Sequence, residues 1–387
     1  MAAAALPVTL AAHGTALLVT LARPAALNAL NAEMLALLWG AVRADPAPSA
    51  VVLRGATPRA FCAGGDVRSI WAARGDAAQL SFFRDEYALD WALARHARTR
   101  APHVALWDGV VMGGGVGISM YATLRVATER TLWAMPETAL GLIPDIGGGF
   151  FLPRLPKRGL GAYLGLTGAR LAGADAVHAG VATHFVPAAR LDALLADLAA
   201  LPAPAAAPAF AARAAAARAA VERHATPAAA LPAFSLAGAA ETVIARAFGP
   251  LRGSVPALLE DLRGEAARSG AEGAAASDAL ATLARHSPMA LALTSEQLRR
   301  GATPGATLGG CLAAELRVMR ALLASPTSDF YEGVRAVLVD KGKGPPPAWA
   351  PAAAADARAV REIFDGGEPD EAEAPLRALG SHEAEAE

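Results

Sequence analysis

Short runs of apolar and β-branched residues recur through the first half of the chain, separated by segments with helical spacing. Runs of this length and composition predict strands, and they occur at 17–21, 51–54, 104–107, 124–128, 132–134 and 184–186. Apolar residues that recur every three or four positions predict helices, and these fall at 32–42, 113–121, 160–166 and 173–179. This repeated order of strands and helices predicts an α/β core with a partly parallel sheet.

Asn31 stands immediately before the first predicted helix, where its side chain can accept a hydrogen bond from the helix start. The rest of the chain is mainly helical in pattern, with periodic apolar residues at 277–323 and 329–341. The stretch from 187 to 247 is rich in Ala and Pro, which predicts helices with poorly specified joints.

The chain of 387 residues is long enough for one large domain or two ordinary ones. Its composition predicts three parts: a core at 1–190, a helical C-terminal region at 191–344, and a Pro/Ala-rich, acidic tail at 345–387 that is partly disordered. A formal net charge of -1 gives no general electrostatic reason to bind nucleic acid or an anionic membrane.

Cys62 and Cys311 lie far apart and form no CxxC motif, so disulfide scaffolds and structural zinc sites are not expected. The first 22 residues carry no charged side chain, but no basic segment precedes their apolar part, and the first basic residue is Arg23. These features argue against a signal or transit peptide. The uncharged run at 109–124 is too short and too rich in glycine to span a bilayer. We expect a soluble, cytoplasmic protein.

The stretch from 135 to 155 places two carboxylates, Glu137 and Asp145, among apolar residues and glycines. An unpaired charge in such surroundings is costly, so its presence favours a functional role. Pro136 suits the first turn of a helix, whose dipole would favour ionised Glu137, whereas burial in a turn would raise the pKa of Asp145. The alternative is a helix-start carboxylate and a turn aspartate without function.

Two glycine-rich segments, 59–66 and 112–119, each follow a predicted strand. Free backbone N–H groups from two such loops can form an oxyanion hole for a thioester or ester carbonyl. The alternative is tight packing that only glycine permits.

Competing motifs are not found in the sequence. Neither glycine segment matches a dinucleotide or ATP fingerprint, Ser119 lies outside GxSxG, and the histidines show no HExxH spacing. We therefore predict structural roles for three histidines, His103, His178 and His184. Cys62 is predicted to be a small buried thiol rather than a nucleophile.

Two groups of segments are similar to a known family. The first group comprises 60–67, 113–117 and 135–137. The second comprises 82–87, 112–119, 125–129, 135–155, 180–186 and 329–341. The first group resembles the crotonase (enoyl-CoA hydratase/isomerase) superfamily, and the second resembles its 3-hydroxyisobutyryl-CoA hydrolase branch. The resemblance extends from about residue 17 to 341, except for the Ala/Pro-rich middle.

This resemblance implies a crotonase-like spiral of strand–strand–helix units with a helical C-terminal part, and acyl-CoA thioesters as substrates. It assigns the oxyanion hole to the N–H groups of Ala63 and Gly114. Substrate contacts are assigned to Glu86, Gly114, Glu137 and Asp145, of which Glu137 and Asp145 are the expected catalytic residues. Glu86 has an alternative interpretation as a solvated helix charge.

Two positions depart from the superfamily pattern. Gly117 stands where hydratases carry a second catalytic glutamate, so water addition to a double bond would lose half of its acid–base groups. Ala25 stands where relatives often carry a lysine near the nucleotide. The candidates for binding CoA are therefore Arg23, Gly64, Gly65, Asp66 and Arg68, with Arg59 as a further basic residue.

The expected reaction is hydrolysis of 3-hydroxyisobutyryl-CoA to 3-hydroxyisobutyrate and CoA, a step of valine breakdown. Glu137 would act as nucleophile or as general base, and Asp145 would hold the substrate hydroxyl or manage a proton. No metal or separate cofactor is expected, because CoA is part of the substrate. The alternatives are an enoyl-CoA hydratase or isomerase and a non-catalytic acyl-CoA-binding protein, and a homo-oligomer is possible.

Overall fold

The computed structural model describes residues 6–205, 209–250 and 254–366. By its internal contacts the chain forms two compact units, each assembled from separate segments. The first unit comprises 1–66, 88–133 and 171–234. The second comprises 67–87, 134–170 and 235–387.

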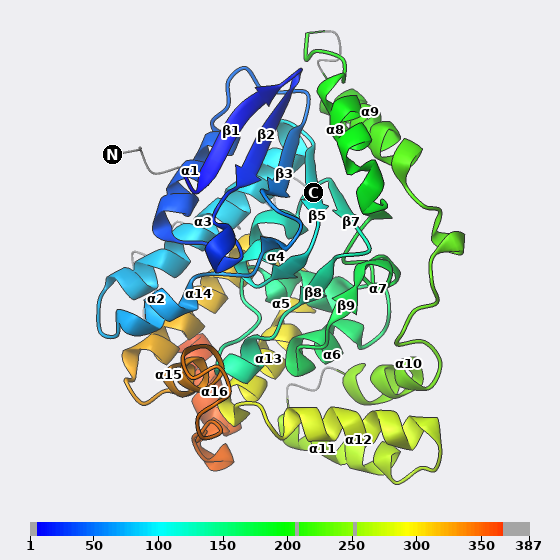
Figure 1. Cartoon of the computed structure of the whole chain (residues 1–387). Helices are drawn as coiled ribbons and strands as arrows, with labels where there is room; N and C mark the ends of the chain where they lie inside the picture. Colours follow the sequence, from blue (N-terminus) through cyan, green and yellow to red (C-terminus); the bar gives the residue numbers. More distant parts are fainter. Residues whose placement is uncertain (1–5, 206–208, 251–253, 367–387) are drawn as a thin grey trace. The chain divides into compact units, whose positions relative to one another are not determined.

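A six-stranded sheet forms the centre of the first unit (Figure 1). Its strands, in spatial order, are β1 (Val8–His13), β2 (Ala16–Leu21), β3 (Val51–Gly55), β5 (His103–Trp107), β7 (Leu124–Ala127) and β10 (His184–Phe185). The first two strands form an antiparallel hairpin, and the others continue in parallel. The structure therefore confirms a mixed α/β core with a largely parallel sheet.

A second, smaller sheet holds β4 (Ala60–Cys62), β6 (Val110–Met112), β8 (Leu132–Ala134) and β9 (Leu171–Ala172) in that order. β4 and β6 are parallel, so the loops that follow them leave the same edge of the sheet. A side-chain carbon added to Gly64 would lie 3.9 Å from the backbone nitrogen of Gly114. The two glycine segments of the sequence are therefore neighbours.

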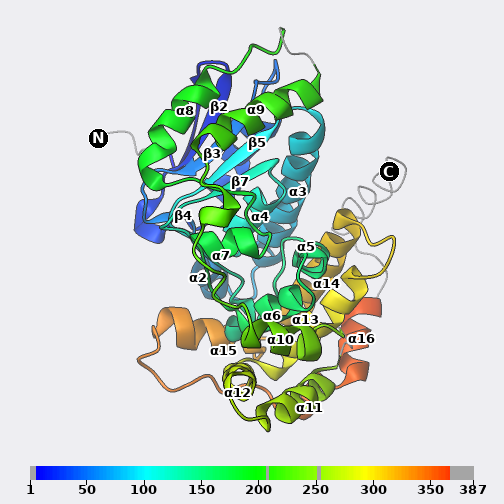
Figure 2. The same cartoon turned by 90° about the vertical axis from the view of Figure 1, so that its right-hand side faces the viewer.

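Helices cover one face of the larger sheet, where α8 (Leu191–Ala199) and α9 (Phe210–His224) cross the strands (Figure 2). The core between them contains Val52 and Val104 from the sheet and Leu194 and Val221 from the helices. The remaining helices of the first unit are α1 (Ala32–Val42), residues 88–99 of α3 (Ala78–Thr99), α4 (Gly114–Met120), α7 (Gly173–His178), and the short turns η1 (Pro24–Ala26), η4 (Ala188–Arg190) and η5 (Ala228–Ala230).

Helices make up the second unit, and α3 (Ala78–Thr99) belongs to it with its first ten residues. Its longer helices are α11 (Val255–Ala266), α12 (Ala271–Leu283), α13 (Pro288–Gly301), α14 (Leu308–Ala324) and α16 (Ala357–Asp365). Its shorter ones are α2 (Val67–Ala72), η2 (Glu137–Leu140), α5 (Gly148–Phe151), η3 (Leu152–Arg154), α6 (Leu160–Thr167), α10 (Ala239–Val243), η6 (Ile244–Phe248), α15 (Asp329–Val334), η7 (Arg335–Val339) and η8 (Ala352–Ala355).

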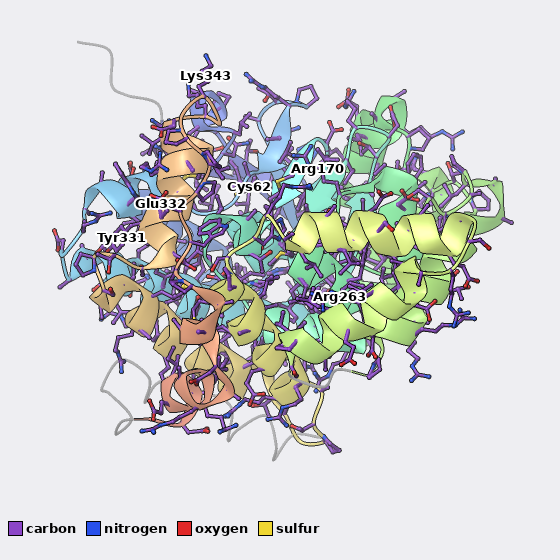
Figure 3. The ribbon with its side chains drawn as sticks, turned by 90° about the horizontal axis from the view of Figure 1, so that it is seen from below. Cys62, Arg170, Arg263, Tyr331, Glu332 and Lys343 are labelled. Carbon is purple, nitrogen blue, oxygen red and sulfur yellow. The ribbon has the colours of Figure 1, made fainter. Side chains whose placement is uncertain are left out.

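Side-chain contacts fix α15 within this unit. Tyr331, labelled in Figure 3, donates its hydroxyl proton to Gln79 Oε1 at 3.1 Å. The backbone oxygen of Tyr331 accepts a hydrogen bond from Trp71 Nε1 at 2.9 Å. Glu332 on the same helix pairs with Arg335 at 2.6 Å.

The predicted strands and helices of the first half are confirmed, within a residue or two at their ends. Further elements of the structure were not predicted from the sequence, namely β1, β4, β6, β9 and α3. Part of the expected acidic tail is helical, because Val360 and Phe364 on α16 are buried. The last 21 residues, 367–387, lie outside the described part, and the expected three-part division stays a prediction. Among the described residues no helix is long and apolar enough to cross a membrane.

Asn31 caps α1 as the sequence predicts, because its Oδ1 accepts the N–H of Met34 at 2.9 Å. Asn31→Ala is expected to lower the free energy of unfolding by about 1 kcal/mol, the usual value of such a cap. Urea denaturation of both proteins measures the difference. Equal midpoints and slopes would show that the cap contributes nothing.

Candidate functional site

The glycine loop after β4 belongs to the first unit, and its backbone contacts correct one expectation. The N–H of Ala63 donates to the Leu27 carbonyl at 3.0 Å, so this group is already engaged within the protein. The next two residues, Gly64 and Gly65, differ from Ala63 in the contacts of their N–H groups. The Gly64 carbonyl accepts the Leu30 N–H at 2.8 Å, but within the described chain no hydrogen bond engages the N–H of Gly64 or Gly65. The available donor on this loop is therefore one of these two glycines rather than Ala63.

The second donor, Gly114, is the first residue of α4. N–H groups of a first helical turn have no partner within the helix, and no hydrogen bond among the described residues engages this one. The next glycine has a packing role, since a side-chain carbon on Gly115 would lie 2.3 Å from the Cys62 carbonyl oxygen. The packing interpretation is therefore confirmed for Gly115, and the oxyanion-donor role of Gly114 stays a prediction.

Two of the CoA-binding candidates have partners inside the protein. Arg23 Nη2 pairs with Asp66 Oδ2 at 2.7 Å, and its Nη1 donates to the Ala29 carbonyl at 2.9 Å. These contacts give Arg23 and Asp66 a structural role in the loop. Arg59 and Arg68 are exposed, and Arg68 belongs to α2 of the second unit. Contacts with CoA stay a prediction for all of these residues.

The predicted acidic residues form a buried cluster within the second unit. Glu86 comes from α3, Glu137 from η2, and Asp145 from the loop before α5; they are 2%, 5% and 7% exposed. Tyr87 donates its hydroxyl proton to Asp145 Oδ2 at 2.7 Å. Glu86 is therefore not a solvated helix charge, and the structure brings all three predicted carboxylates of the second unit together.

Burial dominates the protonation of this cluster. It raises the pKa of Glu137 and that of Glu86 well above their usual range, and the nearby Asp145 charge raises both further. Burial also raises the pKa of Asp145 to about 6, against the hydrogen bond from Tyr87. The predicted rise in the pKa of Asp145 is confirmed. Glu137 does begin a helix after Pro136, the four-residue 3₁₀ helix η2, but the prediction that this setting favours ionised Glu137 is wrong, because burial raises its pKa.

Two carboxylate oxygens of the cluster are unsatisfied. Glu86 Oε1 and Glu137 Oε2 are buried, and neither has a hydrogen-bond partner within the described residues. Buried polar atoms in proteins are nearly always hydrogen-bonded, so exceptions require an explanation. A contact of these oxygens with a polar group of a substrate, or with the water that attacks it, would supply this explanation.

Three polar residues of this region were not predicted as site residues from the sequence: Tyr87, Gln297 and Glu315. The Glu315 carboxylate accepts the backbone N–H groups of Gly147 and Gly149, just after Asp145, and the side chain of Gln297. Burial raises the pKa of Glu315 to about 8, and the two backbone N–H donors oppose this shift. An acidic residue on the apolar face of a predicted helix was the signal available in the sequence.

Histidine and cysteine side chains outside the cluster have structural contacts. His103 and His96 are buried against each other, with 2.8 Å between their ring nitrogens, and burial lowers the pKa of His103 to about 3. His178 contacts the Pro232 carbonyl. Cys62 is fully buried, and its thiol donates to the Asn28 carbonyl at 3.0 Å. The predicted buried thiol is confirmed.

A family model described as enoyl-CoA hydratase/isomerase matches residues 16–364. The chain belongs to this family.

Curated relatives agree with the hydrolase branch of the family. The chain is 40% identical over 335 residues to a Xenopus tropicalis protein named "3-hydroxyisobutyryl-CoA hydrolase, mitochondrial", covering 85% of this chain and 81% of the frog protein. It is 37% identical over 354 residues to the Homo sapiens protein of the same name, covering 90% and 85% of the two chains.

Solved structures show the same fold under other names. A carnitinyl-CoA dehydratase from Mycobacterium thermoresistibile superposes with a TM-score of 0.76 at 34% identity, covering 94% of this chain and 98% of the other. An enoyl-CoA hydratase from Rhodobacter sphaeroides 2.4.1 gives 0.74 at 34% identity, covering 93% and 97%. The fold is therefore that of the crotonase enzymes.

Proposed function

We propose that this chain hydrolyses the thioester of 3-hydroxyisobutyryl-CoA to give 3-hydroxyisobutyrate and CoA. The observation that carries the proposal is the buried pair Glu137 and Asp145, in a chain whose curated relatives are named as this hydrolase. The family supports an acyl-CoA as the substrate class.

The backbone N–H groups of the glycine loops would stabilise the reacting carbonyl. We assign the thioester oxygen to Gly114 and to one N–H of the Gly64–Gly65 pair. Negative charge develops on this oxygen when the carbonyl carbon becomes tetrahedral, and fixed N–H donors lower the energy of that state. Donors that a fold fixes in advance need no reorganisation during the reaction.

Glu137 would supply the basic or nucleophilic group. As a nucleophile, a carboxylate oxygen of Glu137 bonds to the carbonyl carbon, the carbon–sulfur bond breaks, and CoA leaves as the thiolate. Water then hydrolyses the acyl-enzyme anhydride. As a general base, Glu137 instead removes a proton from the attacking water, and its raised pKa makes it a stronger base.

Asp145 would hold the 3-hydroxyl group of the substrate or transfer a proton. Its pKa of about 6 lies near neutral pH, where a carboxyl group exchanges protons most effectively. Glu86, with an unsatisfied buried oxygen, would contact the substrate.

The purified protein is expected to release CoA from 3-hydroxyisobutyryl-CoA without added metal, at the same rate before and after treatment with chelator. The reason is that acyl transfer to a carboxylate or to water needs only the oxyanion donors and the carboxylates named above. A thiol reagent that reports free CoA measures the rate. Activity that chelator removes and a divalent ion restores would contradict the metal-free mechanism.

The hydratase alternative predicts a different product. Gly117, which stands where a hydratase carries its second glutamate, lies in α4 and has no side chain to transfer a proton. Hydration is followed by loss of enoyl absorbance, and hydrolysis by free thiol. An acyl-CoA-binding protein without activity would give neither signal, although it would retain acyl-CoA in equilibrium dialysis.

We further propose a cytoplasmic location and leave homo-oligomer formation to experiment. The curated relatives quoted above are named as mitochondrial proteins, so location has to be measured for this chain itself. Cell fractionation tests the first point. Light scattering on the purified protein tests the second.

A further inference from the structure

The loop that carries Asp145 is fixed by a second buried carboxylate. We call residues 144–149 the Asp145 turn. Glu315 on α14 accepts the N–H of Gly147 through Oε2 at 2.8 Å and the N–H of Gly149 through Oε1 at 3.0 Å. Its side chain is fully buried. Both ends of one carboxylate therefore bind the backbone immediately after Asp145.

Gln297 on α13 completes this contact from the other side. Its Nε2 donates to the Pro144 carbonyl at 2.9 Å and to Glu315 Oε1 at 2.8 Å. The side chain is only 4% exposed. The residues before and after Asp145 are thus tied to the same pair of helices.

The Asp145 turn needs such support, because its backbone is strained. Ile146 has φ 55°, in the left-handed region that β-branched residues seldom adopt. A residue held in this region persists only where its surroundings impose it. A side-chain carbon on Gly149 would lie 2.9 Å from Gln297 Cγ, so glycine lets the helix approach.

The chemistry of the contact requires a carboxyl group. Three N–H donors meet at Glu315, and both oxygens of its carboxyl group accept hydrogen bonds from them. A glutamine at this position would turn its own NH₂ group toward one of these donors. The exchange leaves the side-chain volume almost unchanged while it breaks at least one hydrogen bond to the Asp145 turn.

We propose that Glu315, supported by Gln297, is a positioning residue that fixes the direction of the Asp145 carboxylate. This inference rests on the proposed function, in which Asp145 meets the substrate. Tyr87 binds Asp145 Oδ2, and Glu315 sets the backbone from which that side chain projects. Glu315 itself touches no substrate.

The test compares Glu315→Gln, Asp145→Asn and the double variant. Glu315→Gln is expected to lower kcat for 3-hydroxyisobutyryl-CoA by about 10²-fold, because misplacing a reacting group by about 1 Å costs this much. If Glu315 acts through Asp145, the double variant is no slower than Asp145→Asn alone, since residues that act as a unit are not additive.

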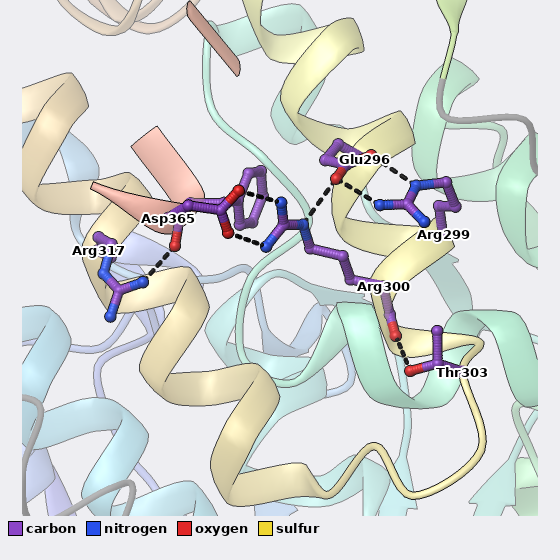
Figure 4. Close-up of polar contacts among 7 residues, drawn as sticks. Glu296, Arg299, Arg300, Thr303, Arg317 and Asp365 are labelled. Carbon is purple, nitrogen blue, oxygen red and sulfur yellow. Dashed lines mark hydrogen bonds and ion pairs between the residues drawn. The ribbon is translucent and has the colours of Figure 1, made fainter. Parts of the chain in front are cut away.

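Glu296→Gln is the matched control, because Glu296 is also a buried carboxylate, on α13. It accepts hydrogen bonds from Arg299 and Arg300 at 2.7 Å, and Arg300 also pairs with Asp365 of α16 (Figure 4). Glu296→Gln weakens helix packing and changes no hydrogen bond of the Asp145 turn. We expect a lower melting temperature and a kcat within about twofold of the wild type, as for a substitution outside the site.

Two results would overturn the proposal. One is a double variant whose loss of kcat equals the product of the two single losses. The other is a fall in kcat for Glu296→Gln that matches Glu315→Gln at equal loss of stability. Either result makes Glu315 a general packing residue.

Amide hydrogen exchange separates this proposal from the proposed function. In Glu315→Gln the peptide covering the Asp145 turn is expected to exchange faster than in the wild type, and in Glu296→Gln to exchange as in the wild type. A wild-type protein that releases no CoA contradicts the proposed function, and exchange then still decides whether Glu315 holds the turn. Unchanged exchange in Glu315→Gln contradicts the positioning role whatever the activity.

Discussion

Glu137→Gln is expected to abolish the release of CoA from every acyl-CoA tested. A general base contributes about 10²–10⁴-fold to the rate, and a nucleophile contributes more. The amide of glutamine has nearly the same shape as the carboxyl group but neither accepts a proton nor attacks a thioester. The rate of thiol release, measured under single-turnover conditions, gives the loss directly.

The matched control is Glu260→Gln, which makes the same chemical change at an exposed position on α11. It should retain full activity, and circular dichroism of both variants should match the wild type. A correctly folded Glu137→Gln protein with full activity would remove Glu137 from the mechanism.

Turnover in ¹⁸O-labelled water separates the two roles of Glu137. In the anhydride mechanism, water that attacks the glutamyl carbon leaves ¹⁸O in the Glu137 carboxyl group. In the general-base mechanism, and when water attacks the substrate acyl carbon of the anhydride, the label enters only the product acid. Label in the peptide that contains Glu137, detected by mass spectrometry, therefore identifies the anhydride mechanism.

Asp145→Asn is expected to slow hydrolysis of 3-hydroxyisobutyryl-CoA by about 10²–10⁴-fold if Asp145 transfers a proton in the transition state. If it mainly holds the hydroxyl group, the loss should be much smaller for a thioester that lacks the 3-hydroxyl. Isobutyryl-CoA is the matching substrate. Equal activity of variant and wild type on both substrates would contradict either role.

The same substitution is expected to stabilise the protein above pH 6. Folding raises the pKa of Asp145 from 3.8 to about 6, so the folded state binds this proton more tightly than the unfolded state. The wild type therefore loses stability as pH rises from about 4 to about 6, and Asp145→Asn removes that loss. Its charge also disfavours ionised Glu137 and Glu86, which adds to the effect.

Thermal unfolding of both proteins between pH 4.5 and pH 8 measures this effect. The variant should gain in melting temperature relative to the wild type as pH rises. If the difference in melting temperature between variant and wild type did not change with pH, Asp145 would titrate in the folded state as it does in the unfolded chain.

The sequence by itself determined every strand of the larger sheet except β1, several helices and the acidic stretch of the site. These features rest on local patterns, since the apolar repeat fixes an element and a side chain such as Asn31 caps the helix that follows it. Long motifs also identified the family. Two of its expected site residues, Glu137 and Asp145, lie within one of these continuous segments.

The tertiary structure decided which groups are free and which are charged. The sequence located the glycine loop, but the free donor depends on Leu27, a residue distant in the chain that occupies the Ala63 N–H. A helix start predicted an ionised Glu137, whereas its raised pKa follows from burial, which only packing creates. Glu315 reaches the Asp145 turn from 170 positions downstream, and no local pattern encodes that contact. Hydrogen-bond partners and desolvation are properties of the assembled fold, and they set the chemistry of this site.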